Sequence, residues 1–249
     1  MKRFGIIGRP LDHSASPQLF QDRFAKAGLK DHRYDRFELK DIAELSELLK
    51  TPGLRGLNVT HPFKQQVLEH LEELDATARA VGAVNTITLS EERSIGSNTD
   101  VIGFAECLKE IMPELFGPEP GVRALVLGSG GASHAVSHVL RELQVPFNVV
   151  SRDRDRGDLS WAMVDRTVVK YSRLIVNCTP VGMGELKGKA LPLPFDAITK
   201  AHILIDLIYD PAETPFMKEG KAQGAKVCNG KAMLLAQAEA SWRLWQELP

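Results

Sequence analysis

The stretch Leu125-Val126-Leu127-Gly128-Ser129-Gly130-Gly131-Ala132-Ser133-His134-Ala135 decides the fold of this 249-residue chain. The apolar run at residues 124–127 is typical of a buried parallel strand. The residues after the glycines carry apolar side chains at helical spacing, at Ala135, Val136, Val139, Leu140 and Leu143. A strand, a glycine turn and a helix in this order direct backbone N–H groups and the positive end of a helix toward a phosphate.

Glycine suits this turn because a Cβ would block both the tight bend and the approach of a pyrophosphate. The spacing is Gly-x-Gly-Gly-x-x-x-Ala, so Ser133 stands where the usual dinucleotide fingerprint has a third glycine or alanine. An ordinary glycine-bearing loop is the alternative interpretation. The strand before the turn and the helix after it favour a dinucleotide, which we expect to bind at Gly128, Gly130, Gly131 and Ala132.

The composition argues against several classes of protein. With 43% hydrophobic and 25% charged residues, the chain is typical of a soluble globular protein. The 31 basic and 32 acidic residues leave a net charge of −1, which gives no electrostatic footprint for nucleic acid or an anionic membrane. The apolar run near the start stops at Gly8, too early for a signal peptide, and no segment approaches membrane-spanning length.

The three cysteines, Cys107, Cys178 and Cys228, show neither metal-ligand spacing nor a disulfide framework. A reducing cytosol accounts for this usage. We therefore expect a cytoplasmic protein, either a monomer or a homodimer, with no bound metal and with no nucleic-acid or membrane partner.

Predicted strands and helices alternate along the rest of the chain, which indicates an α/β fold with parallel-type layers. In the first hundred residues we expect strands at residues 3–8, 56–60 and 83–89, and helices that begin near residues 17, 42, 64, 75 and 101. Residues 113–121, which include three prolines, predict a linker. In the second half we expect strands at residues 147–151, 174–177, 203–207 and 225–228, and a long helix from Gly230. Residues 151–174 are few for a helical crossover, so we expect a stub or an irregular turn there.

Several polar residues stand where α/β proteins bind ligands. Lys64 is predicted in the first turn of a helix, where the helix dipole disfavours a cation by some tenths of a kcal/mol. It closely follows Asn58 and Thr60 at the carboxyl end of a strand, although a solvated surface lysine is the alternative. Asp100 and Ser16 each precede a predicted helix, so an N-cap is the alternative role for either residue.

Blocks spread over the whole chain give these residues one explanation. The blocks are Ser14-x-Ser16, Asn58-Val59-Thr60-His61-Pro62-Phe63-Lys64, Gly82-Ala83-Val84-Asn85-Thr86, Asn98-Thr99-Asp100, Gly128-Ser129-Gly130-Gly131-Ala132, Asn177-Cys178-Thr179-Pro180-Val181-Gly182-Met183, Asp206-Leu207-Ile208-Tyr209-Asp210-Pro211 and Gly230-Lys231-Ala232-Met233-Leu234-x-x-Gln237. In composition and order they resemble the shikimate dehydrogenase family. The run Asn-Val-Thr-x-Pro-x-Lys with a later Asn-Thr-Asp is highly specific.

The resemblance implies an NADP-dependent oxidoreductase of aromatic amino-acid (chorismate) biosynthesis, which transfers a hydride between a nicotinamide dinucleotide and 3-dehydroshikimate or shikimate. Lys64 and Asp100 would be the catalytic pair, with Lys64 handling the proton and Asp100 positioning it. The implied substrate contacts are Ser14 and Ser16 to the carboxylate, Asn58, Thr60, Asn85 and Gln237 to the ring hydroxyls, and Tyr209. The implied cofactor contacts are Gly128, Gly130, Gly131, Ala132, Ser151, Arg152, Arg156, Asn177, Thr179, Gly182, Met183 and Gly230.

The cofactor segment departs from the family pattern. The family's NADP form has Asn-Arg-Thr and a second basic residue, whereas this chain has Ser151-Arg152-Asp153-Arg154-Asp155-Arg156. Arg152 and Arg156 can clamp a 2′-phosphate, but Asp153 would repel it or bind a free ribose hydroxyl. A solvated turn of offsetting charges is a further interpretation. The sequence favours NADP, with NAD as the alternative.

The fold implied is α/β, with an N-terminal α/β substrate domain, a Rossmann-like dinucleotide-binding domain and a cleft between them. We expect residues 1–103 to bind substrate, completed by a C-terminal helix at residues 230–249, and residues 104–229 to bind NADP. One alternative is a broad-specificity quinate/shikimate dehydrogenase that uses NAD. Another is a catalytically silent ligand-binding module, which the retention of both Lys64 and Asp100 disfavours.

Overall fold

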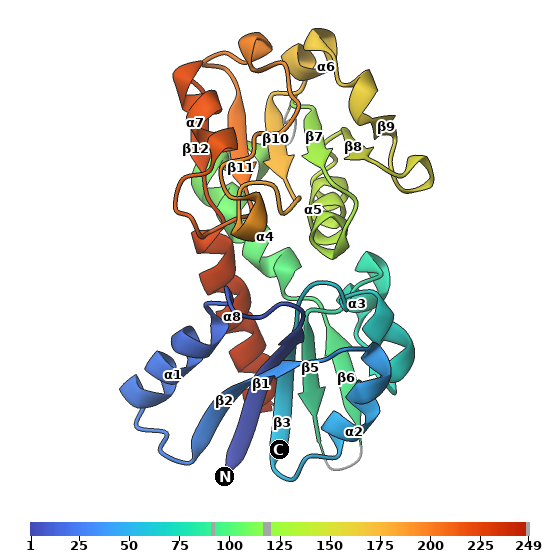
Figure 1. The fold of residues 1–249 in the computed structure, drawn as a ribbon, viewed down its shortest axis with the longest axis vertical. Helices are drawn as coiled ribbons and strands as arrows, with labels where there is room; N and C mark the ends of the chain where they lie inside the picture. The colour runs from blue at the N-terminus through green and yellow to red at the C-terminus, as the bar shows by residue number, and fades with distance from the viewer. Residues whose placement is uncertain (91–92, 117–120, 248–249) are drawn as a thin grey trace. The chain divides into compact units, whose positions relative to one another are not determined.

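Two six-stranded sheets organise the chain, one in each of two units (Figure 1). The computed structural model describes residues 1–90, 93–116 and 121–247. Unit 1 comprises Met1–Thr99 together with the chain from Gln237 onward, and unit 2 comprises Asp100–Ala236. The division of substrate and cofactor binding at residues 103 and 230 stays a prediction. Within the described ranges, no helix is both long and apolar enough to cross a membrane.

Unit 2 has the wholly parallel sheet that the glycine stretch predicts. Its strands are β7 (Ala124–Leu127), β8 (Phe147–Ser151), β9 (Leu159–Ser160), β10 (Leu174–Asn177), β11 (Ile203–Asp206) and β12 (Lys226–Cys228). They lie in the order β12-β11-β10-β7-β8-β9, and each neighbouring pair is parallel (Figure 1). Counted from β7, this is the doubly wound order of a Rossmann fold, whose strand order reverses between β7 and β10. Such folds bind ligands at the carboxyl ends of the strands beside this switch point.

The packing of β7 explains why all four of its residues are apolar. All four side chains are buried, and they alternate between the two faces of the sheet. Ala124 and Val126 pack on one face with α4 (Asp100–Ile111) and α5 (Gly131–Glu142). Leu125 and Leu127 pack on the other face with α6 (Arg166–Tyr171) and α7 (Pro215–Ala222). The strand is therefore covered on both sides, as parallel strands require.

The chain between β8 and β10 confirms the predicted stub. It contains η4 (Arg154–Arg156), the two-residue β9, η5 (Trp161–Met163) and only six residues of helix in α6. Two further short 3₁₀ turns, η6 (Gly184–Leu186) and η7 (Phe195–Ala197), follow β10. The predicted linker begins with another, η3 (Pro113–Phe116), and its residues 117–120 lie outside the described part of the chain.

The sheet of unit 1 is mixed, so the expectation of parallel-type layers holds for only some of its strands. Its strands are β1 (Lys2–Gly8), β2 (His32–Glu38), β3 (Leu54–Val59), β4 (Glu73–Leu74), β5 (Thr86–Leu89) and β6 (Ser94–Ser97), in the order β2-β1-β3-β5-β6-β4. Strand β5 runs antiparallel to both β3 and β6. For β5 and β6 the reason is the short connection: Ser90 and Arg93 pair directly beyond these two strands, whereas a parallel crossover needs a dozen or more residues.

The helices of unit 1 anchor its sheet. They are α1 (Ser16–Lys26), η1 (Ile42–Glu44), α2 (Leu45–Leu49), η2 (Gln66–His70), α3 (Ala76–Val81) and the part of α8 (Lys231–Glu247) that begins at Gln237. Helix α8 packs Trp242 and Trp245 against Phe4 of β1 and Phe20 of α1. The indole N–H of Trp245 donates to the carbonyl of Ile87 at 3.0 Å.

The residues at the helix N-termini can be compared with the helix starts and N-caps considered from the sequence. Asp41 and Asp75 cap η1 and α3, next to where helices were expected to begin, through bonds from the Ala43 and Ala78 amides at 2.8 and 2.6 Å. Ser16 is not a cap: Ala15 already has helical φ/ψ values and its carbonyl accepts from Leu19, so Ser16 is the first helical residue.

Asp100 is likewise the first residue of α4 rather than the residue before it.

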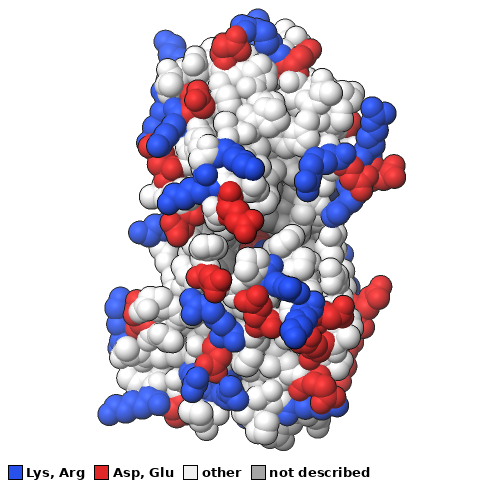
Figure 2. All heavy atoms as spheres, viewed as in Figure 1, with Lys and Arg blue, Asp and Glu red and all other residues white. Residues whose placement is uncertain are grey.

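On the face of the molecule shown in Figure 2, basic and acidic side chains are interspersed over the surface of each unit.

Candidate active site

Lys64 lies in the turn between β3 and η2, and it is half-buried. The prediction that it lies in the first turn of a helix is wrong, because the helical segment is the 3₁₀ turn η2, which starts at Gln66. The Lys64 carbonyl accepts a bond from the Val84 amide at 2.7 Å. The Leu68 amide therefore pairs with the Gln65 carbonyl, three residues back, rather than with Lys64.

A buried polar cluster lies at the carboxyl end of β3. Asn58, the fifth residue of that strand, is buried and accepts a 2.7 Å bond from the Tyr34 hydroxyl. Its amide nitrogen lies 3.1 Å from the Ser241 hydroxyl of α8. The side-chain oxygen of Asn85 accepts from the Thr99 amide at 2.7 Å. Neutral polar groups thus satisfy one another in the interior, as buried hydrogen-bonding groups must.

Helix α8 joins this cluster through Gln237. The Gln237 side-chain oxygen lies 3.4 Å from the Asn85 amide nitrogen and 3.5 Å from the Thr99 hydroxyl. Asn58, Asn85 and Gln237, which were assigned from three separate blocks, therefore share one cluster within unit 1. The sequence reasoning assigned no role to its other members, Tyr34, Thr86, Thr99 and Ser241, although Thr86 and Thr99 lie in the quoted blocks. The available signal was that Ser241 lies one helical turn after Gln237.

Ser14 and Thr60 follow the carboxyl ends of two neighbouring parallel strands, β1 and β3. Thr60 is half-buried, and its amide donates to the Ile7 carbonyl at 2.9 Å. Ser14 is half-buried, and its hydroxyl oxygen lies 3.4 Å from the amide of the buried Ser16. These hydroxyls lie at the edge where α/β sheets bind ligands. Asp100 is 5% exposed and belongs to unit 2, so its pairing with Lys64 stays a prediction.

The glycine turn of unit 2 has the backbone that a phosphate site needs. Gly128 has φ +103°, and a Cβ there would lie 2.9 Å from the Thr179 methyl group. Gly130 is the N-cap of α5, and a Cβ built on it would meet no atom within 4 Å. Gly131 and Ala132 form the first turn of this helix. The turn is thus open to a ligand in front of the α5 N-terminus.

The departure at Ser133 has a local explanation. Its side chain is buried and its hydroxyl donates to the Gly130 carbonyl at 2.6 Å. The serine therefore closes the turn from within the protein. It does not stand in the space in front of the helix.

The carboxyl end of β8 adjoins this turn. Ser151 is buried and its hydroxyl lies 2.8 Å from that of Ser129. The exposed Arg156 donates to the Ser129 carbonyl at 2.8 Å, and Arg152 is exposed. The Asp153 carboxylate accepts from the Asp155 amide at 3.1 Å and so caps η4.

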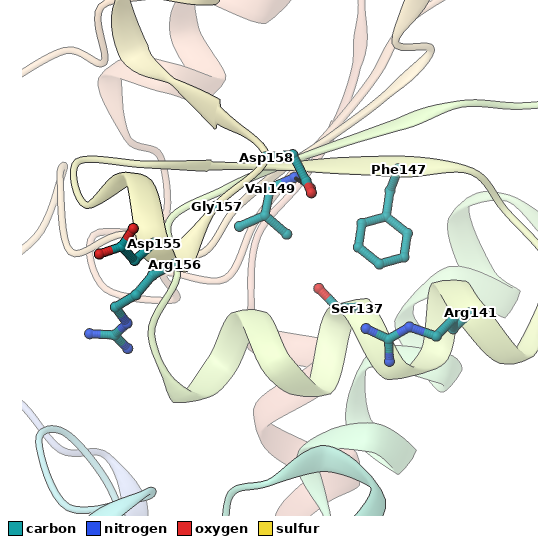
Figure 3. A pocket seen from close by; sticks show the side chains of 8 residues that line it. All are labelled: Ser137, Arg141, Phe147, Val149, Asp155, Arg156, Gly157 and Asp158. Carbon is teal, nitrogen blue, oxygen red and sulfur yellow. Dashed lines mark hydrogen bonds between the residues drawn. The ribbon is translucent and has the colours of Figure 1, made fainter.

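A hollow of about 480 Å³ lies beside Arg156 (Figure 3). Its lining residues are Ser137, Arg141, Phe147, Val149, Asp155, Arg156, Gly157 and Asp158. Ser137 and Arg141 project from α5 toward Phe147 of β8, and the Arg141 guanidinium lies 5.6 Å from the centre of that ring (Figure 3).

The loops after β10 and β11 meet at a buried carboxylate. Asp206 is fully buried and accepts from the side chains of Asn177, at 3.0 Å, and Thr214, at 2.6 Å. Burial raises the pKa of Asp206 to about 6, and these hydrogen bonds only partly offset that effect. Thr179 donates to Asn177, which brings two predicted cofactor contacts together.

Four other predicted residues lie in or next to these loops. Gly182 has φ +114°, and Met183 is the N-cap of η6. Tyr209 is half-buried after β11. Gly230 approaches the chain so closely that a Cβ would lie 2.0 Å from the Leu207 carbonyl oxygen, which makes glycine obligatory there.

Comparison with known proteins places this geometry in one family. Residues 6–87 match the shikimate dehydrogenase substrate binding domain. The shikimate dehydrogenase (NADP(+)) of Methanococcus maripaludis is 34% identical over 264 residues, which cover 98% of this chain and 91% of that protein. The corresponding protein of Bacillus cereus is 34% identical over 258 residues, covering 97% of this chain and 91% of that protein.

Solved structures of related dehydrogenases are similar to this chain over nearly its full length. The Thermus thermophilus shikimate 5-dehydrogenase in complex with NADP(H) and shikimate is 36% identical, with a TM-score of 0.86 over 100% of this chain and 94% of that one. A Corynebacterium glutamicum quinate dehydrogenase in complex with NAD is 28% identical, with a TM-score of 0.85 over 99% of this chain and 94% of that one. Since the likeness to the curated relatives extends over nearly the full length of both sequences, this chain belongs to the shikimate dehydrogenase family.

Proposed function

We propose that this protein is an NADP-dependent shikimate dehydrogenase that reduces 3-dehydroshikimate to shikimate reversibly, as a step of aromatic amino-acid (chorismate) biosynthesis in the cytoplasm. One observation carries the proposal. On the family's fold, the chain combines an open glycine turn beside the switch point of a parallel sheet with a cluster of neutral polar side chains in the other unit. The first feature suits a dinucleotide and the second suits a polyhydroxylated substrate.

The glycine turn fits the pyrophosphate of NADP. A Cβ at Gly130 would project into open space in front of the α5 N-terminus, so the backbone itself can approach a phosphate. When bound, the cofactor supplies the hydride. In this proposal Gly128, Gly130, Gly131 and Ala132 hold the pyrophosphate, and the contacts of the remaining part of the cofactor are Ser151, Asn177, Thr179, Gly182, Met183 and Gly230.

Lys64 and Asp100 handle the proton that ketone reduction requires. A hydride on the carbonyl carbon leaves negative charge on the oxygen, and a positioned acid there typically contributes ~10²–10⁴ in rate. Lys64 donates the proton to that oxygen, and Asp100 orients the ammonium group and the resulting hydroxyl. In the reverse reaction the same pair accepts the proton.

The substrate contacts are groups without net charge. Ser14 and Ser16 donate to the carboxylate, while Asn58, Thr60, Asn85 and Gln237 bind the ring hydroxyls, with Tyr209 also at the substrate. Hydroxyl and amide side chains both donate and accept, so they match ring hydroxyls and disfavour analogues that lack them. The bonds among Asn58, Asn85 and Gln237 support this role because they fix the side-chain orientations before the substrate arrives.

The preference for NADP rests on Arg152 and Arg156, which flank the position of a 2′-phosphate in this proposal. The contact of Arg156 with Ser129 holds its guanidinium beside the glycine turn. Asp153 is engaged by the Asp155 amide in its own turn, which lessens its competition for a ribose hydroxyl. The NAD-bound quinate dehydrogenase relative gives the alternative, a broad-specificity quinate/shikimate dehydrogenase that uses NAD.

A steady-state assay of reduced-nicotinamide absorbance tests the function. Shikimate and quinate are each assayed with NADP and with NAD. Turnover confined to shikimate with NADP is the expected result. Comparable turnover of quinate or with NAD contradicts the proposed specificity and favours the alternative, and shikimate binding without any turnover contradicts the enzymatic role. Size-exclusion chromatography with light scattering distinguishes the monomer from the homodimer.

A further inference from the structure

The buried Asp206 has no part in the chemistry proposed above, yet its contacts reach both loops of the cofactor site. It is the last residue of β11, and its side chain is 0% exposed. Three donors converge on its carboxylate: the Asn177 amide nitrogen at 3.0 Å, the Ile208 backbone N–H at 3.1 Å and the Thr214 hydroxyl at 2.6 Å. All three donors are neutral, so the carboxylate is held by hydrogen bonds of the protein's own loops.

The first contact leads to the loop after β10. The Asn177 side-chain oxygen accepts from the amide and the hydroxyl of Thr179, at 2.9 and 2.7 Å. That oxygen is thereby occupied, so the amide nitrogen of Asn177 must face Asp206. The Thr179 hydroxyl in turn accepts from the Val181 amide at 3.2 Å, which sets the path of the chain toward Gly182.

Thr179 then reaches the glycine turn. Its methyl group lies 2.9 Å from the position that a Cβ would take on Gly128. Strands β7 and β10 are neighbours, and the sheet order reverses between them, so this contact lies at the switch point. A continuous path of contacts thus runs from Asp206 through Asn177 and Thr179 to the turn where the pyrophosphate is expected.

The other two contacts lead to the loop after β11. Thr214 is buried and caps α7 by accepting from the Met217 amide, while its hydroxyl donates to Asp206. A Cβ on Gly182 would lie 3.1 Å from Thr214, so the two loops touch. The bond from Ile208 fixes the chain one residue before Tyr209.

We propose that Asp206 is a positioning residue for cofactor binding, which holds the loops after β10 and β11 in the shape that completes the dinucleotide site at the glycine turn without touching the cofactor itself. The inference rests on the proposed function, because it takes the cofactor to be a dinucleotide. A neutral side chain at this buried position would avoid the desolvation that raises the pKa of Asp206 to about 6. The presence of an acid at this position, with three donors from the two loops directed at it, therefore agrees with a positioning role.

Two substitutions test the proposal. Asp206→Ala removes all three acceptor contacts and should raise the KM for NADP by about tenfold or more, by analogy with the cost of removing a group that orients a metal ligand. The KM for shikimate should stay within about twofold, because the substrate contacts in unit 1 are untouched. Asp206→Asn keeps an acceptor oxygen for Asn177 and Ile208 and should recover most of the NADP affinity. NADP affinity is also measured directly by calorimetric titration, which needs no turnover.

The matched control is Glu213→Gln, which removes a carboxylate from the same loop. Glu213 is half-exposed and pairs with Lys221, so the variant should behave as the wild type. If Asp206→Ala does not fold, as judged by circular dichroism, Thr214→Val removes one of the three donors to Asp206 at a residue outside the proposed cofactor contacts, and it should raise the KM for NADP alone.

Three results would overturn the inference. These are unchanged NADP affinity in folded Asp206→Ala or in Thr214→Val, equal losses of affinity for both ligands, and no recovery in Asp206→Asn. An inactive wild type would instead refute the proposed function, so the two failures are distinguishable.

Discussion

At the scale of single residues, Lys64 carries the proposed proton transfer, and its removal separates chemistry from binding. Lys64→Ala should lower kcat by ~10²–10⁴ with little change in the KM for shikimate, because the proton is needed only as charge develops on the carbonyl oxygen. Steady-state kinetics with NADP measures both constants. Lys50→Ala is the matched control, since Lys50 is exposed and pairs with Glu47. A loss of substrate affinity with kcat unchanged would give Lys64 a binding role only.

Asp206 should leave a signature in the pH dependence of stability. Its folded-state pKa of about 6 lies above its ordinary value of 3.8, so the folded state binds the proton more tightly than the unfolded state does. The stability it contributes is complete below pH 3.8 and is lost as the pH rises through about 6, by ~3 kcal/mol in all. Asp206→Asn should remove this component. Urea unfolding from pH 4 to pH 8 measures it, and parallel curves for the two proteins would contradict the expectation.

At the scale of elements, apolar strands were predictable and charged strands were not. The run 124–127 has one physical explanation, a strand buried on both faces. Strand β2 is missing from the prediction because His32–Glu38 is rich in charged residues, and only Tyr34 is buried along it. Such an edge strand is defined by its pairing with β1, which local composition does not reveal. The direction of β5 was missed for the same reason, since it depends on the pairing with β6.

A substitution in the glycine turn should change NADP binding without changing the free energy of unfolding. Gly130→Ala should leave the free energy of unfolding nearly unchanged, because the new Cβ meets no atom within 4 Å and φ is already −88°. It should raise the KM for NADP by about tenfold or more, since the methyl group would stand where the proposed site receives the pyrophosphate.

Gly128→Ala is the contrast, because its φ of +103° and the Thr179 methyl at 2.9 Å make alanine strained. That variant should lose stability as well as NADP affinity. Urea unfolding and NADP titration measure the two effects, and wild-type NADP affinity in Gly130→Ala would refute the phosphate site.

At the scale of the whole molecule, the sequence singled out polar residues as site candidates but did not show how they are connected. The polar residues Asn58, Asn85 and Gln237 were identified from separate blocks, and the structure brings them into one cluster. Their partners Thr86 and Ser241 lie 155 residues apart, and no local pattern specifies such a pair. Asp206 likewise belongs to a quoted block, but its reach across two loops is visible only in three dimensions.

The assignment of substrate to unit 1 and cofactor to unit 2 can be tested with the three tryptophans. Trp242 and Trp245 are buried in unit 1, whereas Trp161 belongs to unit 2, so fluorescence of a Trp161→Phe variant reports on unit 1 alone. A ligand at 100 times its Kd stabilises the part that binds it by about 2.7 kcal/mol. Shikimate alone should therefore raise the urea midpoint of this fluorescence, and NADP alone should leave it unchanged.

NADP should instead shift a second transition, followed by circular dichroism of the whole chain, which includes unit 2. Wild-type protein with each ligand is the control for the substitution, because Trp161 is half-exposed and lies outside the site residues proposed above. NADP alone could raise the urea midpoint of the tryptophan fluorescence as much as shikimate does. In that case either the two units unfold together or the cofactor contacts unit 1. Either result would contradict a division of binding between independently stable units. The NADP affinities of the Gly130→Ala and Asp206→Ala variants would then show whether NADP still binds at the glycine turn.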